Sequence, residues 1–152
     1  MEKNLIKCGP GGHEVQDIET VQNTSLINPK PGQVIVAEGY ENQGEHLVAI
    51  AFAGSDLATK VKRIVVDDPA YGVDHVYQDG EDLLTEIPMP GQYYNLLVES
   101  SVAVVVGDVF VPEGGYMVEF GDATVQDTMS RFAPIETSPA GSSDRLVTFR
   151  AL

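Results

Sequence analysis

Two runs of β-forming residues, each framed by turn formers, decide the fold: Gln33-Val-Ile-Val-Ala37, between Pro31-Gly32 and Glu38-Gly39, and His46-Leu-Val-Ala-Ile-Ala-Phe52, between Asn42-Gln-Gly44 and Gly54. Glycine and proline favour tight turns, whereas valine, isoleucine and phenylalanine favour strands. The second run is apolar on both faces of a strand, so it should lie in the centre of a sheet or be covered on both sides. The stretch therefore predicts two short strands in a compact β structure.

The same alternation continues to the end of the chain. Further runs of this kind cover residues 60–66, 82–87, 92–99, 102–106, 109–111, 116–120 and 145–150. Short strands at regular spacing, separated by Gly, Pro and Asp, are typical of an all-β sandwich or barrel. Within 82–87, Leu83 and Thr85 should share one strand face, with Leu84 and Glu86 on the other. We expect an all-β, small β-barrel or β-tulip-like domain, with a two-sheet β-sandwich as the alternative.

The two ends of the chain differ from this pattern. Residues 1–31 hold turn formers and only short apolar pieces, so we expect an extended N-terminal arm. The alternative is a first hairpin of the barrel, with Val15 and Ile18 packed inward. Residues 32–152 should form the single β-barrel domain, and the Pro, Gly and Ser residues of about 133–144 predict a surface loop.

The charge balance excludes some partners. The chain has 152 residues, with 9 Lys+Arg against 23 Asp+Glu and a formal net charge of −14. Between Ile64 and Ser130 there is no Lys or Arg, although 13 acidic residues lie there. Nucleic acid and anionic membrane surfaces require clustered Lys and Arg, so we expect neither as a partner. An acidic surface of this kind favours solubility or a basic partner.

No residue pattern points to a catalytic, cofactor or metal site. Cys8 is the only cysteine, so an intrachain disulfide cannot form. The three histidines, His13, His46 and His75, lack the close spacing that would pair them as metal ligands. We therefore expect a protein that is not an enzyme, with no cofactor and no metal. The first ten residues contain no apolar segment of the signal-peptide type, so we expect a cytosol-like compartment.

Several segments, taken in order, resemble the small decoration (cement) proteins of tailed-phage heads. The segments that carry the resemblance are Pro31-Gly32-Gln-Val-Ile-Val, Asp74-His-Val-Tyr77-Gln-Asp-Gly80-Glu-Asp-Leu83, Pro90-Gly91-Gln-Tyr-Tyr-Asn-Leu-Leu, and Ser101 to Phe110 with Gly107-Asp108 inside it. About half to two-thirds of the chain takes part, and the segment from Met117 to Ser143 lies outside the match. Each motif alone is a generic turn signal, so the resemblance rests on their order and spacing.

The resemblance implies a role in the virion. Such proteins are small β-barrels or β-tulips, usually homotrimers, that bind three-fold or quasi-three-fold positions on the outside of an expanded HK97-type capsid and stabilise it. The implied partner is the major capsid protein, and the implied location is the capsid exterior after assembly in the host cytoplasm. Candidate capsid or subunit contacts are the arm residues Leu5 and Ile6 and the basic residues Lys60, Lys62 and Arg63. The basic residues could equally protect an edge strand from aggregation.

Two alternative functions remain open. A phage tail, baseplate or head–tail adaptor protein would share the β-rich sequence, the acidity and the absence of catalysis. A trimeric all-β nucleotide hydrolase of the dUTPase type is less favoured. Gly72-Val-Asp74-His-Val-Tyr77-Gln-Asp-Gly80-Glu81 is similar to a segment of that family, but both glycines are displaced by one residue relative to Tyr77. The few basic residues also give little to hold a triphosphate.

Overall fold

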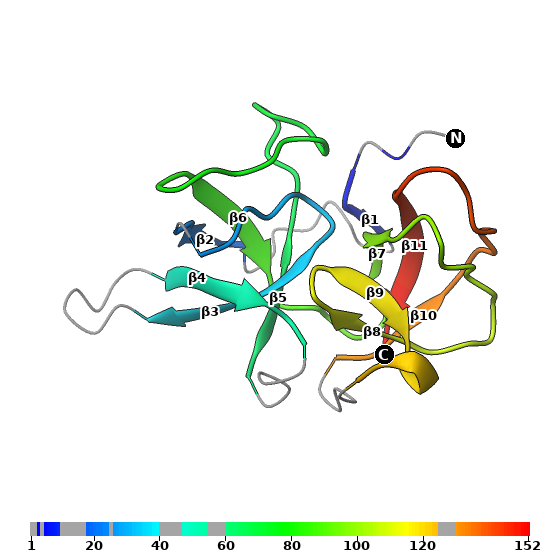
Figure 1. Ribbon diagram of the computed structural model, residues 1–152. Coiled ribbons are helices and arrows are strands. Elements are labelled where there is room, and N and C mark those ends of the chain that lie inside the picture. The colour runs from blue at the N-terminus through cyan, green and yellow to red at the C-terminus, as the bar shows by residue number, and fades with distance from the viewer. Residues whose placement is uncertain are drawn as a thin grey trace.

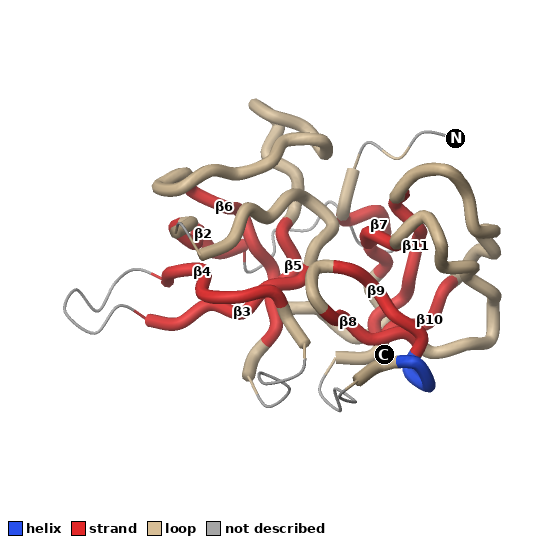
Figure 2. Tube along the Cα trace, in the orientation of Figure 1, coloured by secondary structure: helices blue, strands red, loops and turns tan. Residues whose placement is uncertain are grey.

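The computed structural model describes residues 3, 5–9, 18–24, 26–39, 47–54, 60–124 and 130–152. In these residues the chain is all-β, apart from one short 3-10 helix, Phe120–Asp122. Its strands fall into two groups, a barrel at the left of Figure 1 and a second sheet at the right, with loops between them (Figure 2). The strands are β1 (Lys7–Gly9), β2 (Ile18–Gln22), β3 (Val34–Gly39), β4 (Leu47–Phe52), β5 (Lys62–Val65), β6 (Asp82–Glu86), β7 (Tyr93–Val98), β8 (Phe110–Glu113), β9 (Tyr116–Glu119), β10 (Phe132–Pro134) and β11 (Arg145–Ala151).

The first group is a closed barrel with the strand order β2-β4-β3-β5-β6. Strand β2 closes it, because β2 pairs in parallel with β4 and antiparallel with β6. The other barrel neighbours are antiparallel. Closure removes the free edges that an open sheet of such apolar strands would expose. The predictions of an all-β fold and of a β-barrel are confirmed.

The second group is a six-stranded sheet with the order β1-β7-β11-β10-β8-β9. All of its pairs are antiparallel. The C-terminal strand β11 lies between β7 and β10, and β7 pairs with six residues of β11 from Arg145 to Arg150. The two free edges are the three-residue strand β1 and the four-residue strand β9. The closed barrel thus ends at Glu86, and the remaining strands of residues 32–152 build a separate sheet.

Strand β3 takes part in two apolar cores because its side chains alternate between faces. Ile35 points into the barrel, where it packs with Val21, Tyr77 and Leu83. Val34 and Val36 point the other way, into the core that the barrel shares with Tyr94, Leu96, Phe110 and Phe149 of the second sheet. This sharing explains why the run of residues 33–37 is apolar on both faces.

The turn Pro31-Gly32 lies where the barrel and the second sheet meet. The Gly32 amide donates to the Val65 carbonyl (2.9 Å), and its own carbonyl accepts from the Leu97 amide (2.9 Å). A side chain at this position would lie 2.6 Å from Leu146 Cδ2, and the glycine has a φ of +90°. Both facts require glycine here. The motif thus joins β5 of the barrel to β7 of the second sheet.

Some expected elements differ in the structure. Residues 102–106 form no strand, because only Val104 pairs, through a single bridge to Ser138. Residues 1–31 contribute two strands, β1 at an edge of the second sheet and β2 within the barrel. Ile18 is 49% exposed rather than packed inward, and Val15 lies outside the described residues. The expected loop of 133–144 begins with the end of β10.

Candidate interaction surface

The N-terminal segment, residues 3 and 5–9, is fixed across the junction between the barrel and the second sheet. Ile6 is fully buried in the shared core, and its amide donates to Asp67 Oδ1 (2.8 Å). Lys7 Nζ lies 2.8 Å from Glu86 Oε1 of the barrel, where the Glu86 side chain is buried at 1% exposure and that of Lys7 is 10% exposed. Leu5 alone of the predicted arm contacts is exposed, at 53%. Ile6 therefore packs inside its own chain, and of this pair only Leu5 presents a surface.

A polar network on the outer face of the second sheet holds the same segment. Lys3 Nζ lies 2.8 Å from Glu136 Oε1 and donates to Thr148 Oγ1 (2.6 Å). Asn95 Nδ2 donates to the Leu5 carbonyl (2.6 Å). Burial raises the pKa of Glu136, but hydrogen bonds from Lys3 and the Thr148 amide, with the Lys3 charge, outweigh it and leave that pKa below its usual value.

The predicted basic cluster is mostly buried. Lys62 is 2% exposed and donates to the Lys60 carbonyl, and Arg63 is 9% exposed and lies 3.2 Å from Glu19 Oε2. Strand β5 pairs with β3 and β6 on its two sides, so it is no edge strand in need of protection. Lys60 alone is well exposed, 3.6 Å from Glu38. Lys62 and Arg63 were predicted as candidate contacts, and their burial leaves little of either side chain exposed to a partner.

An aromatic cluster occupies the loop between β5 and β6, in the segment compared with nucleotide hydrolases. The rings of Tyr71 and His75 stack at 4.3 Å, and His75 Nε2 lies 2.9 Å from Glu81 Oε2. Tyr77 lies edge-on to His75 at 4.6 Å and is fully buried in the barrel interior. Burial, with nearby carboxylates, raises the pKa of Tyr77 to about 12. This tyrosine therefore packs a core rather than offering a ring to a ligand.

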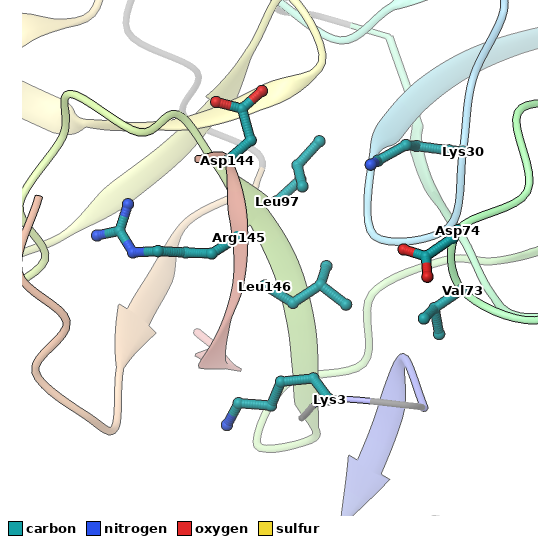
Figure 3. A pocket seen from close by; sticks show the side chains of 8 residues that line it. All are labelled: Lys3, Lys30, Val73, Asp74, Leu97, Asp144, Arg145 and Leu146. Carbon is teal, nitrogen blue, oxygen red and sulfur yellow. The ribbon is translucent and has the colours of Figure 1, made fainter. Parts of the chain in front are cut away.

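A first groove, the junction groove, separates the barrel from the second sheet (Figure 3). Its volume is about 260 Å³. In Figure 3, Lys30 and Asp74 reach in from one side, while Leu97 and Leu146 lie opposite and Arg145 turns away. The lining carries both signs of charge, so it selects for neither an anion nor a cation. Lys3, at its lower rim, is already bound to Glu136.

A second groove, the C-terminal groove, has mainly apolar walls and a volume of about 320 Å³. It is lined by residues 61–62 of the barrel, residues 87–88 and 90 that follow β6, residues 130–132 at the start of β10, and residues 151–152 at the end of the chain. Its wall residues Val61, Ile87 and Leu152 are 42–52% exposed. Met89, between two lining prolines, is 43% exposed. Large apolar side chains gathered around one groove mark an interaction site, whereas scattered ones do not.

One arginine lines this groove, and a second lies on the same face of the sheet. Arg131 lines it, with its guanidinium 4.5 Å above the Phe120 ring. The register of β10 and β11 places Arg150 on the same sheet face as Leu152 and Arg131. Among the residues that the structure describes, neither arginine is in an ion pair, whereas Lys3, Lys7, Lys60 and Arg63 are. On a chain of net charge −14, this is an unusual basic spot.

An exposed apolar turn follows β7. Val105 and Val106 are 50% and 54% exposed at the tip of a turn closed by a hydrogen bond from the Asp108 amide to the Val105 carbonyl (3.3 Å). Residues 102–106 were predicted as a strand from their apolar character. The structure instead places Val104 in the core and presents the two valines after it to solvent.

The loop that carries this apolar turn is firmly held. The Arg145 guanidinium donates to the carbonyls of Glu99 (2.9 Å) and Val102 (2.7 Å), and to Ser138. Val104 exchanges two backbone hydrogen bonds with Ser138 (2.8 and 2.9 Å). The Ser100 amide donates to Asp144 Oδ1 (2.9 Å). An apolar tip on an ordered loop can bind a partner at little entropic cost.

Sequence reasoning missed both the C-terminal groove and the apolar turn. The groove combines four separate chain segments, so no local pattern encodes it. The turn had a signal, since Val104-Val-Val-Gly-Asp108 is an apolar run directly before a turn pair. The sequence alone does not reveal that this run lacks a neighbouring strand to pair with.

The described residues contain no group of three or more His, Cys, Asp or Glu arranged to hold a metal ion. Cys8 is exposed, and neighbouring atoms desolvate its thiol and raise the pKa, the opposite of what a nucleophile requires. No helix in the described part of the chain has the length and apolarity needed to cross a bilayer. Comparison with known proteins finds no family model that matches the sequence and no curated protein with significant similarity.

Proposed function

We propose that this chain is a decoration protein that binds the outside of an expanded tailed-phage capsid and stabilises it, as a homotrimer and without catalysis. The observation that carries the proposal is the C-terminal groove with its exposed apolar walls. Apolar surface of this kind on an acidic chain favours a protein partner. Within the assembly that we propose, the groove supports association between copies of the chain. The order of motifs along the sequence, from Pro31-Gly32 to Gly107-Asp108, favours a capsid as the partner of the assembled protein.

The architecture supports a role in stabilising the capsid mechanically. The barrel and the second sheet share one core, and the N-terminal segment ties them through Ile6 and the buried Lys7–Glu86 pair. A protein that clamps neighbouring capsomers must resist separation of its own parts. Many copies on a symmetric shell also gain from avidity, so each contact can be modest. Among the five predicted contact residues, Leu5 and Lys60 are the exposed ones, and we propose these two as capsid contacts.

Sedimentation with expanded empty capsids tests this function. The proposal predicts saturable binding at a copy number close to that of the major capsid protein, and weaker binding after Leu5→Asp. Unexpanded shells are the control. A protein that stays in the supernatant at every shell concentration would contradict the proposal. Saturation at a few copies per particle would favour the tail or head–tail adaptor instead, and hydrolysis of nucleotide by the pure protein would favour the enzyme.

A further inference from the structure

The apolar turn and the C-terminal groove are complementary to each other. The turn presents two valines, Val105 and Val106, that are 50% and 54% exposed. The groove offers apolar walls from Val61, Ile87 and Leu152, with a volume of about 320 Å³. That volume is at the small end of the range of about 300–1,000 Å³ for small-molecule sites, and it suits a few inserted side chains.

The charges of the two surfaces also match. The turn lies within the segment from Ile64 to Ser130, which has 13 acidic residues and no basic one, and Asp108 directly follows its tip. Arg131 lines the groove, and Arg150 lies on the same sheet face; neither forms an ion pair within the described residues. Opposite charges beside an apolar contact fix its orientation and discourage wrong partners.

The two surfaces do not meet within one molecule. Arg145 and the Val104–Ser138 bridge hold the turn in place, with its valines facing solvent. In Figure 1 the loop from β7 to β8 runs along the right-hand edge of the molecule, whereas the C-terminus lies below β8. Each surface therefore requires a partner from outside, and the partner that carries the complement of each is a second copy of this chain.

We propose that the Val105–Val106 turn of one copy inserts into the C-terminal groove of the next copy, so that the chains associate head to tail. The contact is heterologous, because it joins two different patches, and such contacts close into rings or continue as filaments. The number of copies in the ring, three, rests on the proposed function. The contact itself rests on the two surfaces and would form without a capsid.

Mixing two variants tests the contact. Val106→Asp places a charge on the turn, and Ile87→Asp places one on a groove wall. Each variant alone should have the mass of one chain, 16.4 kDa, by light scattering after size exclusion, whereas the wild type forms a larger assembly. An equimolar mixture retains one intact turn and one intact groove, so it should give a complex of two chains. Val76→Asp, at a valine that is 44% exposed elsewhere, is the matched control and should keep the wild-type mass.

Circular dichroism and thermal unfolding confirm that each variant is folded. If Ile87→Asp does not fold, the exposed pair Arg131→Glu and Arg150→Glu replaces it. A monomeric wild type at every accessible concentration would overturn the proposal. Retention of the wild-type mass by both variants, or a mixture that stays monomeric, would also overturn it. Loss of capsid binding with these masses unchanged would count against the proposed function alone.

Discussion

The N-terminal segment and the apolar turn are two short stretches with similar apolar content and opposite placement. Ile6 is fully buried and Lys7 is paired inside the protein, whereas Val105 and Val106 are about half exposed. Both stretches are held by hydrogen bonds to the rest of the chain. Ile6 lies beside β7, to which its backbone is hydrogen-bonded, whereas only Val104 of the turn pairs, so apolar composition alone does not decide which segment is buried.

Breaking the ion pair between Lys7 and Glu86 should lower the stability of the protein more than any other change to these two stretches. Glu86→Ala leaves the Lys7 ammonium buried without its partner, which typically costs about 3–5 kcal/mol. We expect urea unfolding to show a loss of stability of this size, because Lys7 joins β1 to the barrel. The double variant Glu86→Ala, Lys7→Met should recover much of the loss. A single variant with the stability of the wild type would show that the pair does not hold the segment.

Ile6 and Leu5 form a matched pair for the next prediction. Ile6→Ala removes a fully buried side chain, and such truncations cost about 2–5 kcal/mol. Leu5→Ala alters a side chain that is 53% exposed, so its effect on unfolding should stay within about 0.5 kcal/mol. Urea titrations of the two variants give their unfolding free energies, and the difference shows how much Ile6 contributes to the core. Equal effects would contradict the placement of Ile6.

Much of the fold could be predicted from the sequence, and the predictions that failed did so for a common physical reason. Turn formers around runs such as Gln33–Ala37 and His46–Phe52 indicated most of the strands correctly, because such turns are encoded locally. Residues 102–106 failed as a strand because pairing depends on a neighbour that the sequence does not reveal. Lys62 was predicted as a candidate contact, but it is only 2% exposed, on a strand that has β3 and β6 at its two sides. The C-terminal groove, made of four distant segments, lies beyond any local pattern.

Removing the side chain that holds the loop between β7 and β8 should affect both stability and association through the apolar turn. Arg145 donates to the carbonyls of Glu99 and Val102, before the apolar turn, and to Ser138. One hydrogen bond to a charged group is worth about 1.5–3 kcal/mol, so Arg145→Ala should lower stability by at least about 2 kcal/mol. Self-association should weaken as well, although Val105 and Val106 are unchanged. Amide hydrogen exchange at Val102 and Val104 would report the loosening directly, and unchanged protection would contradict it.

Acid should weaken the polar network over Lys3 by a smaller amount. The pKa of Glu136 is lower in the folded protein than its usual value of 4.5, so its contribution is present above that value and is lost as pH falls through the folded pKa. Exposed pairs contribute about 0.2–1 kcal/mol, so the unfolding free energy of the wild type should fall by about that amount between pH 5 and pH 3. Glu136→Gln should lack this fall, which urea titrations at the two pH values would measure. Glu119→Gln, in strand β9, serves as a control. The same acid dependence in both variants would contradict this role for Glu136.

The double variant Val105→Ser, Val106→Ser separates association from folding, since these exposed side chains should serve the first and not the second. Light scattering after size exclusion gives the mass, and urea unfolding of the same samples gives the stability. We expect an assembly for the wild type and 16.4 kDa for the variant, with unfolding free energies that agree within about 0.5 kcal/mol once association is included. A variant that keeps the wild-type mass, or that loses its fold, would show that the apolar turn is not an association site.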